Sequence, residues 1–359
     1  MIIGIDASKS ALKKRTGVEN FVYQLILALS EIDKTNTYYL YTDAHLPQEL
    51  INHKNFIERF VPPHRFWNQL HLSRALLRDK PDRYLQPIHT LPPFAPRKSA
   101  AVVHDLAWSK FPKAYTLKQR LMQRFALFNI SRKAARLICV SESTRSDLIT
   151  RKPFTKNKTS VVHLAGVAYE PIPHPKDILN LKSDYFLAGG RLDQRKNVVN
   201  VVKAYYLARE KGIKEKLVLI GDPGYGYEEI LAEIDSNSQY KKDIIMAGYM
   251  GPDRLKDLFP GASAFVFPSL YEGFGLPVLE AMGAGTPVIT ANTSSLPEVA
   301  GEAAILVDPD NSSQIAEAMI EVVTNQVLRA DLINKGKIQA AKFTWHRTAE
   351  QILKILEDL

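Results

Sequence analysis

The sequence of 359 residues contains a single cysteine, which excludes an internal disulfide framework. One thiol also fits a protein kept in a reducing compartment. Cys139 lies in the apolar run RLICV, where we expect a buried structural thiol rather than a nucleophile. Cysteines and histidines at the spacing of a metal site are lacking as well.

Long apolar segments are also missing. The chain begins with MIIGID, without the charged region, apolar stretch and small-residue cleavage site of a secretory signal. No apolar run approaches the roughly 20 residues that span a bilayer. We therefore expect an intracellular, cytoplasmic protein.

Acidic residues are scarce in the first half of the chain. Residues 1–170 contain 27 Lys and Arg against 13 Asp and Glu, whereas residues 171–359 contain 20 against 25. Such asymmetry predicts that one domain faces an anionic partner. Between Leu106 and Ser141 there is no acid at all, but eight cations: Lys110, Lys113, Lys118, Arg120, Arg124, Arg132, Lys133 and Arg136.

Between these cations lie four large apolar residues, Leu121, Phe125, Leu127 and Phe128. The segment therefore predicts a basic amphipathic helix near 116–134. Three interpretations stay open. The helix has a solvated face and packs on a sheet, it meets anionic lipid or a lipid-linked phosphate, or it binds nucleic acid. The aromatic spacing resembles no base-stacking platform, so no nucleic acid is expected.

Short apolar strands alternate with helices along the whole chain. This pattern indicates an α/β fold with parallel sheets covered on both faces. The predicted strands of the first half are 2–6, 38–42, 100–104, 136–140 and 160–163; those of the second half are 185–190, 216–221, 243–248, 263–268, 287–290 and 304–307.

A proline-rich stretch separates the two halves. We predict a first domain over 1–168, a linker over 169–182 and a second domain over 183–344. The last helix, within 345–359, could pack back on the first domain or lie on the second. Two doubly wound domains of this kind face each other across a central cleft, and ligands bind at the carboxyl ends of the strands that border it.

The stretch SLYEGFGLPVLEAMGAGTPVI holds two glutamates eight positions apart, Glu272 in a glycine loop and Glu280 in the predicted helix that follows. A glycine-containing loop leading into a helix exposes backbone N–H groups and the positive end of the helix dipole. One carboxylate on each side of such an anion site suits the two polyol ends of a nucleotide-sugar. As a loop residue, Glu272 is expected to be replaceable without unfolding the protein.

Basic residues follow the first strand of the same domain, in LAGGRLDQRKNVV. Arg191 and Lys196 are therefore expected at the carboxyl edge of that sheet, where they would stabilise the charge of a departing diphosphate.

GGRLDQRKN, followed about 75 residues later by YEGFGLPVLEAMGAGTPVI, closely resembles the retaining glycosyltransferases of family 4, which have the GT-B fold of two Rossmann-like domains. TGVENF near the start and VVHDLAW in the middle extend the resemblance over essentially the whole chain. It implies that the first domain binds the acceptor and the second binds the nucleotide-sugar.

The resemblance also implies residue roles. Glu280 would bind the ribose, Glu272 the donor sugar's hydroxyls, and Arg191 and Lys196, beside Gly190, the diphosphate. Donor contacts from backbone amides would come from Gly273, Phe274, Gly275 and Leu276. In the first domain, Gly17 would let the backbone approach the diphosphate, and His104, flanked by Asp105, would touch the donor sugar.

No cofactor and no metal is expected, because cationic side chains and the helix dipole take the metal's place. The one D-x-D, Asp308–Asp310, is explained by a turn and a helix cap. The lack of a G-x-G-x-x-G after the first strand counts against a dinucleotide oxidoreductase.

TGVENF, HTLPPFAP and HDLAWSKFP look most like the branch of the family that uses GDP-mannose. The resemblance thus implies transfer of a hexose, best mannose, with retention, to a glycan or lipid-linked acceptor. The alternatives are a UDP-sugar donor, a phosphorylase or epimerase of the same architecture, and a non-catalytic anion-binding protein. The basic first domain adds an anionic membrane surface as a partner, which would make the protein peripheral on the inner face of the membrane.

Overall fold

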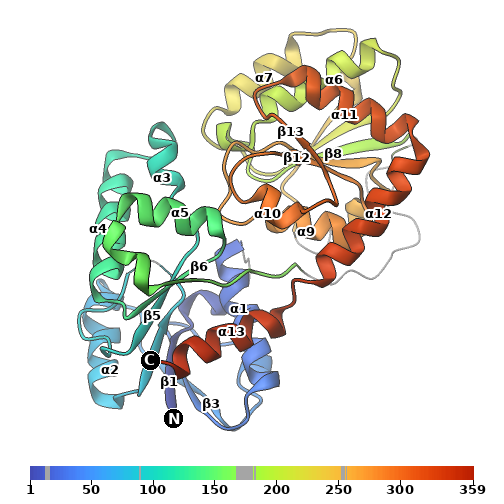
Figure 1. Cartoon of the computed structure of the whole chain (residues 1–359). Helices are drawn as coiled ribbons and strands as arrows, with labels where there is room; N and C mark the ends of the chain where they lie inside the picture. Colours follow the sequence, from blue (N-terminus) through green and yellow to red (C-terminus); the bar gives the residue numbers. More distant parts are fainter. Residues whose placement is uncertain (13–16, 89, 167–180, 182, 252–254, 256) are drawn as a thin grey trace. The chain divides into compact units, whose positions relative to one another are not determined.

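The computed structural model describes residues 1–359 except 13–16, 89, 167–180, 182, 252–254 and 256. The predicted linker thus lies almost entirely outside the described residues. The chain forms two compact units, Met1–Leu164 with Thr344–Leu359, and Ala165–Phe343. Figure 1 shows a parallel sheet flanked by helices in each unit.

The sheet of the first unit has seven parallel strands in the order β3-β2-β1-β4-β5-β6-β7. The strands are β1 Ile2–Asp6, β2 Thr37–Thr42, β3 Phe56–Phe60, β4 Arg83–Gln86, β5 Ser99–Val103, β6 Arg136–Cys139 and β7 Thr159–Val161. The helices are α1 Gly17–Ile32, α2 Ser73–Asp79, α3 Ala107–Lys110, α4 Leu117–Lys133, α5 Glu142–Arg151 and α13 Trp345–Glu357. Strands β3 and β4 were not predicted.

The sheet of the second unit has six parallel strands in the order β10-β9-β8-β11-β12-β13. The strands are β8 Tyr185–Gly189, β9 Lys216–Ile220, β10 Ile244–Gly248, β11 Ala264–Phe267, β12 Val288–Ala291 and β13 Ile305–Val307. The helices are α6 Val198–Glu210, α7 Tyr227–Asp235, α9 Leu276–Gly283, α10 Leu296–Ala300, α11 Ser312–Thr324 and α12 Gln326–Ala341. All six strands lie within about one residue of their predicted ranges.

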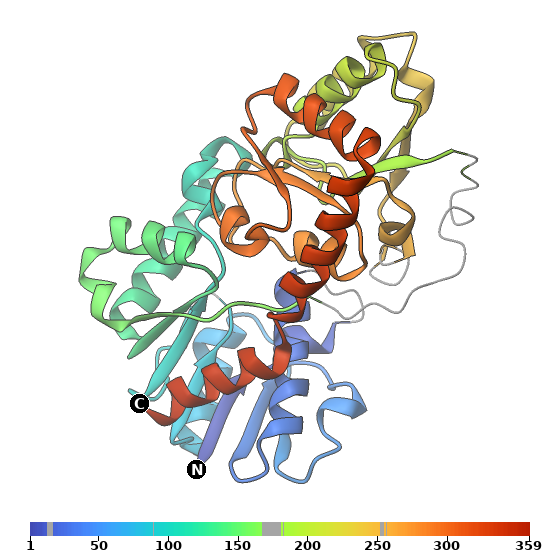
Figure 2. The ribbon, with the colours of Figure 1, turned by 45° about the vertical axis from the view of Figure 1, so that its right-hand side comes forward.

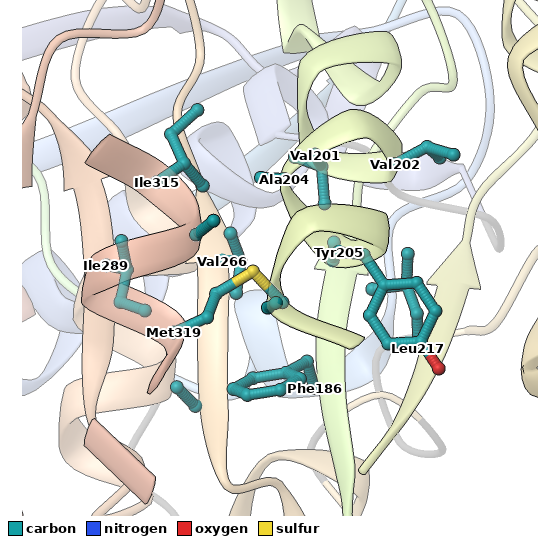
Figure 3. Packing of buried hydrophobic residues seen from close by; sticks show 14 of the residues in the cluster. Phe186, Val201, Val202, Ala204, Tyr205, Leu217, Val266, Ile289, Ile315 and Met319 are labelled. Carbon is teal, nitrogen blue, oxygen red and sulfur yellow. The ribbon is translucent and has the colours of Figure 1, made fainter. Parts of the chain in front are cut away.

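Side chains of the second unit's core interdigitate between the sheet and two adjacent helices. Figure 3 shows Val201 and Tyr205 of α6 and Met319 of α11 over Phe186 of β8 and Val266 of β11. All are almost fully excluded from water, and each such side chain contributes about 1.5–3 kcal/mol to the free energy of unfolding. This core fixes the strand ends from which the site loops leave.

The last helix, α13, belongs to the first unit, although it follows the second in sequence. It runs beside α1 in both views (Figures 1 and 2). The Thr348 hydroxyl donates to the His163 carbonyl at 2.8 Å, and the Arg83 guanidinium donates to the Leu356 carbonyl at 2.9 Å. The chain therefore crosses from the first unit to the second and back. No helix among the described residues has the length and apolar character needed to cross a membrane.

Cys139 is fully buried in β6, and burial raises the pKa of its thiol to about 12. A thiol that stays protonated is a poor nucleophile, so the structural interpretation of this cysteine is confirmed.

Candidate active site

Two glycines shape the loop that follows β8. Gly189 has φ +150°, and a Cβ built on it would lie 2.1 Å from the Ile220 carbonyl oxygen; Gly221 has φ +128°, and a Cβ there would lie 1.6 Å from the Gly190 carbonyl oxygen. Only glycine permits this approach of the two strand ends. The β8 chain then turns outward, placing Arg191 and the short turn Gln194–Lys196 beyond the carboxyl end of the sheet.

Gly190 itself has φ +111°, and a side chain there would reach to 3.2 Å from Cε of Lys196. The Asp193 carboxylate accepts a hydrogen bond from the Lys196 amide at 3.1 Å, which fixes the turn. These contacts direct the Lys196 side chain inward.

The loop after β11 is held by two serines from the segment between β12 and α10. The Glu272 amide donates to the Ser294 hydroxyl at 2.9 Å, and the Ser295 hydroxyl donates to the Phe274 carbonyl at 2.7 Å. The Phe274 ring is buried and meets Phe343 edge to face at 5.8 Å. Residues 269–275 therefore form a well-packed loop rather than a surface excursion.

Glu272 joins the two loops. Its Oε1 accepts from the Lys196 ammonium at 2.6 Å and from the Ser269 hydroxyl at 2.7 Å, and its Oε2 accepts from the Arg195 guanidinium at 2.9 Å. The side chain of Glu272 is 10% exposed and that of Lys196 is 9% exposed. Glu272 lies in a loop, and the expectation that the protein stays folded without it stays a prediction. Its loss would leave two cations without their counter-charge, so we expect a cost in stability.

Electrostatics in this cluster favour the charged carboxylate. Burial alone would raise the pKa of Glu272, but the neighbouring Lys196 and Arg195 charges and the hydrogen bonds lower it to about 2. Burial lowers the pKa of Lys196 from its usual value, and Arg195 adds to this effect while Glu272 opposes it. Glu272 is thus ionised throughout the physiological range.

Glu280 lies one turn into α9 and has a different environment. The side chain is half-buried, and among the described residues its carboxylate has neither an ion pair nor a hydrogen bond. Burial without a compensating cation raises the pKa of Glu280 to about 7. This carboxyl group has capacity for hydroxyl donors supplied by a ligand.

The start of α9 offers backbone donors. Gly275 precedes the helix with φ +111°, and Pro277 occupies the first turn, where its lack of an N–H is tolerated. Within the described parts of the chain, the amides of Gly275 and Leu276 donate to no acceptor. Together with the helix dipole, they can receive an anion.

Arg191 is exposed, and its guanidinium forms no ion pair with any residue that the structure describes. It therefore retains its full capacity for a phosphate. Lys196, by contrast, gives one of its three protons to Glu272.

The remaining predicted residues lie in the first unit. Gly17 is the exposed first residue of α1, and nothing lies within 4 Å of a Cβ built on it. His104 follows β5; its Nε2 lies 2.8 Å from the Pro87 carbonyl oxygen, and its ring meets Phe21 at 5.0 Å. The Asp105 carboxylate accepts from the Ala107 amide at 2.9 Å and so holds the start of α3.

Sequence reasoning missed Arg195 and Ser269, which complete the shell around Glu272. Arg195 adjoins Lys196 in QRKN, so the basic pair was visible, but not which carboxylate it would meet. The turn explanation of Asp308–Asp310 is confirmed: the Asp308 carboxylate accepts from the Asp310 amide at 3.0 Å, and Asn311 caps α11. In the described ranges there is no group of three or more His, Cys, Asp or Glu placed to hold a metal ion.

Comparison with known proteins identifies this arrangement. Residues 173–339 match the family described as Glycosyl transferases group 1, and residues 15–165 match Glycosyltransferase Family 4. The chain is a GT4-like glycosyltransferase. Both halves of this glycosyltransferase are thus matched separately, and the second match contains Arg191, Lys196, Glu272 and Glu280.

Its curated relatives include two mannosyltransferases. The O-antigen chain mannosyltransferase B of Escherichia coli is 29% identical over 287 residues, covering 77% of this chain and 74% of the relative. The serotype-specific mannosyltransferase WbdA of Escherichia coli is 31% identical over 271 residues, covering 71% of this chain. This glycosyltransferase spans only 32% of WbdA's length.

A solved structure supports the fold. The sucrose-phosphate synthase of Thermosynechococcus elongatus aligns with a TM-score of 0.76 at 18% identity, covering 100% of this chain and 98% of the other. The predicted GT-B architecture of two parallel-sheet α/β domains is therefore confirmed.

Proposed function

We propose that the protein transfers mannose from GDP-mannose to a hydroxyl group of a glycan or lipid-linked acceptor, with retention of the anomeric configuration and without a metal. The observation that carries the donor site is the contrast between satisfied and unsatisfied charges. Glu272 is paired with two cations, whereas Glu280 and Arg191 have no partner among the described residues. Likeness to mannosyltransferases supports the choice of sugar.

In this proposal the ribose hydroxyls donate to Glu280, and the diphosphate lies at the amides of Gly275 and Leu276. Arg191 provides a planar fork for phosphate oxygens, and Lys196 provides a point charge beside it. Both cations act most strongly when the leaving diphosphate gains charge, so they stabilise the transition state more than the bound donor.

Oε2 of Glu272 accepts a hydrogen bond from a hydroxyl group of the donor sugar. In the described structure this oxygen has only one protein partner, Arg195. The bond from the anomeric carbon to the phosphate oxygen breaks as the acceptor oxygen attacks from the same face. The acceptor's proton passes to the departing phosphate oxygen. No strong base is required, and catalysis depends on charge stabilisation and positioning.

A thermal-shift screen with GDP-, UDP-, ADP- and dTDP-sugars tests the donor. We expect the largest stabilisation from GDP-mannose, and transfer that persists after treatment with a chelator. A larger shift with UDP-glucose would show that UDP-glucose, not GDP-mannose, is the donor, and would leave the proposed donor site unchanged. No shift with any nucleotide-sugar would contradict the proposed donor site.

The acceptor side is proposed to meet an anionic membrane surface on its cytoplasmic face. The segment from Leu106 to Ser141 has no acid and eight cations, and its helix α4 exposes large apolar side chains. Cations with exposed apolar residues are the two components that bind a protein to anionic lipid. Sedimentation with anionic and neutral vesicles tests this partner.

A further inference from the structure

Helix α4 has two apolar sides. Its inner side consists of Ala126, Leu127 and Ile130, which are 8% exposed or less and pack on the first unit. Its outer side remains in contact with solvent: Leu117 is 68% exposed, Leu121 57%, Met122 61%, Phe125 63% and Phe128 49%. Of the four apolar residues named in the sequence, Leu127 lies on the inner side, and Leu121, Phe125 and Phe128 lie on the exposed outer side.

A cavity of about 530 Å³ lies beside this outer side. Its volume is within the usual range of ligand pockets, about 300–1,000 Å³. No carboxylate is found among the described residues that line it. The cavity is lined by Arg120, Arg124, Arg151 and Lys152, and on its apolar side by Trp108, Leu117 and Leu121.

None of these four cations has an ion pair within the described residues. Arg151 lies over the Trp108 ring at 5.4 Å, and Lys152 lies over the Phe128 ring at 5.7 Å, contacts that orient the charges without neutralising them. The adjoining smaller cavity differs, because the Lys110 ammonium there pairs with the Asp147 carboxylate at 2.8 Å. The larger cavity thus carries an uncompensated positive charge.

Leu117 and Leu121 belong both to the wall of the cavity and to the exposed outer side of α4. The cationic pocket is therefore continuous with an apolar surface. A ligand that matches both has a phosphate at one end and hydrocarbon at the other.

We propose that this cavity binds the phosphate group of an anionic bilayer lipid, while the outer side of α4 lies among the hydrocarbon chains. The inference rests on the membrane partnership proposed above, and it adds a discrete headgroup site to that surface. Arginine suits such a site because its planar fork binds phosphate oxygens in pairs.

The test compares two double variants with equal loss of charge. Arg120→Gln with Arg124→Gln removes two exposed cations of the cavity and keeps a residue that favours helices. Arg74→Gln with Arg97→Gln removes two exposed arginines of the same unit that do not line it. Sedimentation is measured on phosphatidylcholine vesicles with and without phosphatidic acid, at matched salt.

We expect the cavity pair to weaken binding to phosphatidic acid vesicles by about tenfold or more, since each cation at an anionic surface contributes about fivefold. The control pair should weaken it by less than about threefold, through long-range attraction alone. Phe125→Gln should also weaken vesicle binding while leaving the arginines in place. Stabilisation by GDP-mannose should be unchanged in all of these variants.

Equal weakening by the two double variants would overturn the headgroup site and leave a diffuse surface attraction. Thermal stabilisation by inorganic phosphate that depends on Arg120 and Arg124, without any vesicle binding, would overturn the lipid as occupant. If the native protein fails to sediment with anionic vesicles, the membrane partnership itself fails. Because donor binding is measured separately, none of these outcomes is confused with failure of the donor site.

Discussion

Replacing Glu280 by Gln should make the protein more stable while weakening donor binding. The pKa of this half-buried carboxyl is raised to about 7 from an ordinary value of 4.5, because burial disfavours its charged form and no cation among the described residues compensates. That difference corresponds to roughly 3 kcal/mol. With allowance for water reaching the half-buried group, we expect a gain of roughly 2–3 kcal/mol.

The size of this stability gain depends on pH. The folded state keeps the Glu280 proton up to about pH 7, whereas the unfolded chain loses it near 4.5, so the stability contributed by this group falls as pH rises between these values. The glutamine variant has no such dependence. The gain should therefore be near zero at about pH 4.5 and full at about pH 8.

Denaturant unfolding of the native protein and of Glu280→Gln, at both pH values, measures this difference. A gain of the same size at both would show that the effect is not electrostatic. No gain at the higher pH would refute the conclusion that Glu280 is a half-buried carboxylate without a partner among the described residues.

The same residue predicts how donor affinity depends on pH. In the proposed donor site, ribose hydroxyls donate to the ionised carboxylate, so binding should favour its deprotonated form. Affinity for GDP-mannose should rise as the pH increases through about 7, and Glu280→Gln should bind weakly with little pH dependence. If the affinity of the native protein for GDP-mannose does not vary with pH, Glu280 does not bind the ribose.

Three further variants probe Glu272, Arg191 and Arg195. Glu272→Gln should lower the free energy of unfolding by roughly 3 kcal/mol at neutral pH, because the pKa of Glu272 in the folded protein, about 2, lies below the ordinary 4.5. The stability that Glu272 contributes is present above pH 4.5 and is lost as the pH falls through about 2. Acid unfolding of the native protein and of the variant measures this loss. Arg191→Ala should weaken binding of a nucleoside diphosphate by about tenfold and of a monophosphate much less, and equal losses in calorimetry would contradict its phosphate role. Arg195→Ala should lower kcat more than it raises KM, with partial recovery in Arg195→Lys; an unchanged kcat would show that the arginine does not position Glu272.

The sequence predicted most strands of both sheets, because buried parallel strands such as β8 and β9 are short, uninterrupted apolar runs. It missed β3, whose FIERF carries Glu58 and Arg59, since an edge strand tolerates charges. It also missed β4, RYLQ, a central strand of four residues. The polar side chain in β4 is satisfied by distant partners, as the Gln86 amide donates to the Asp6 carboxylate at 3.0 Å.

Periodicity placed α4 within a residue at each end but could not decide which side packs. Apolar residues occur on both sides of the helix, so a single helical stripe does not describe it. The buried side carries Ala126, Leu127 and Ile130, whereas the outer side, with Phe125 and Phe128, stays exposed.

Glu272 and Glu280 show most clearly what spacing cannot encode. The two are the same residue type in one short motif, yet the pKa of Glu272 is lowered to about 2 and the pKa of Glu280 is raised to about 7. The difference comes from Arg195 and Lys196, more than 70 positions earlier, which the glycine-shaped loop after β8 brings to Glu272 and not to Glu280. A carboxylate that the fold has already compensated can be rigid, and one that it has left uncompensated gains most from a ligand's hydroxyl groups. The protein thus holds one glutamate in place with its own charges, and the other has no partner among the described residues, as the proposed donor site requires.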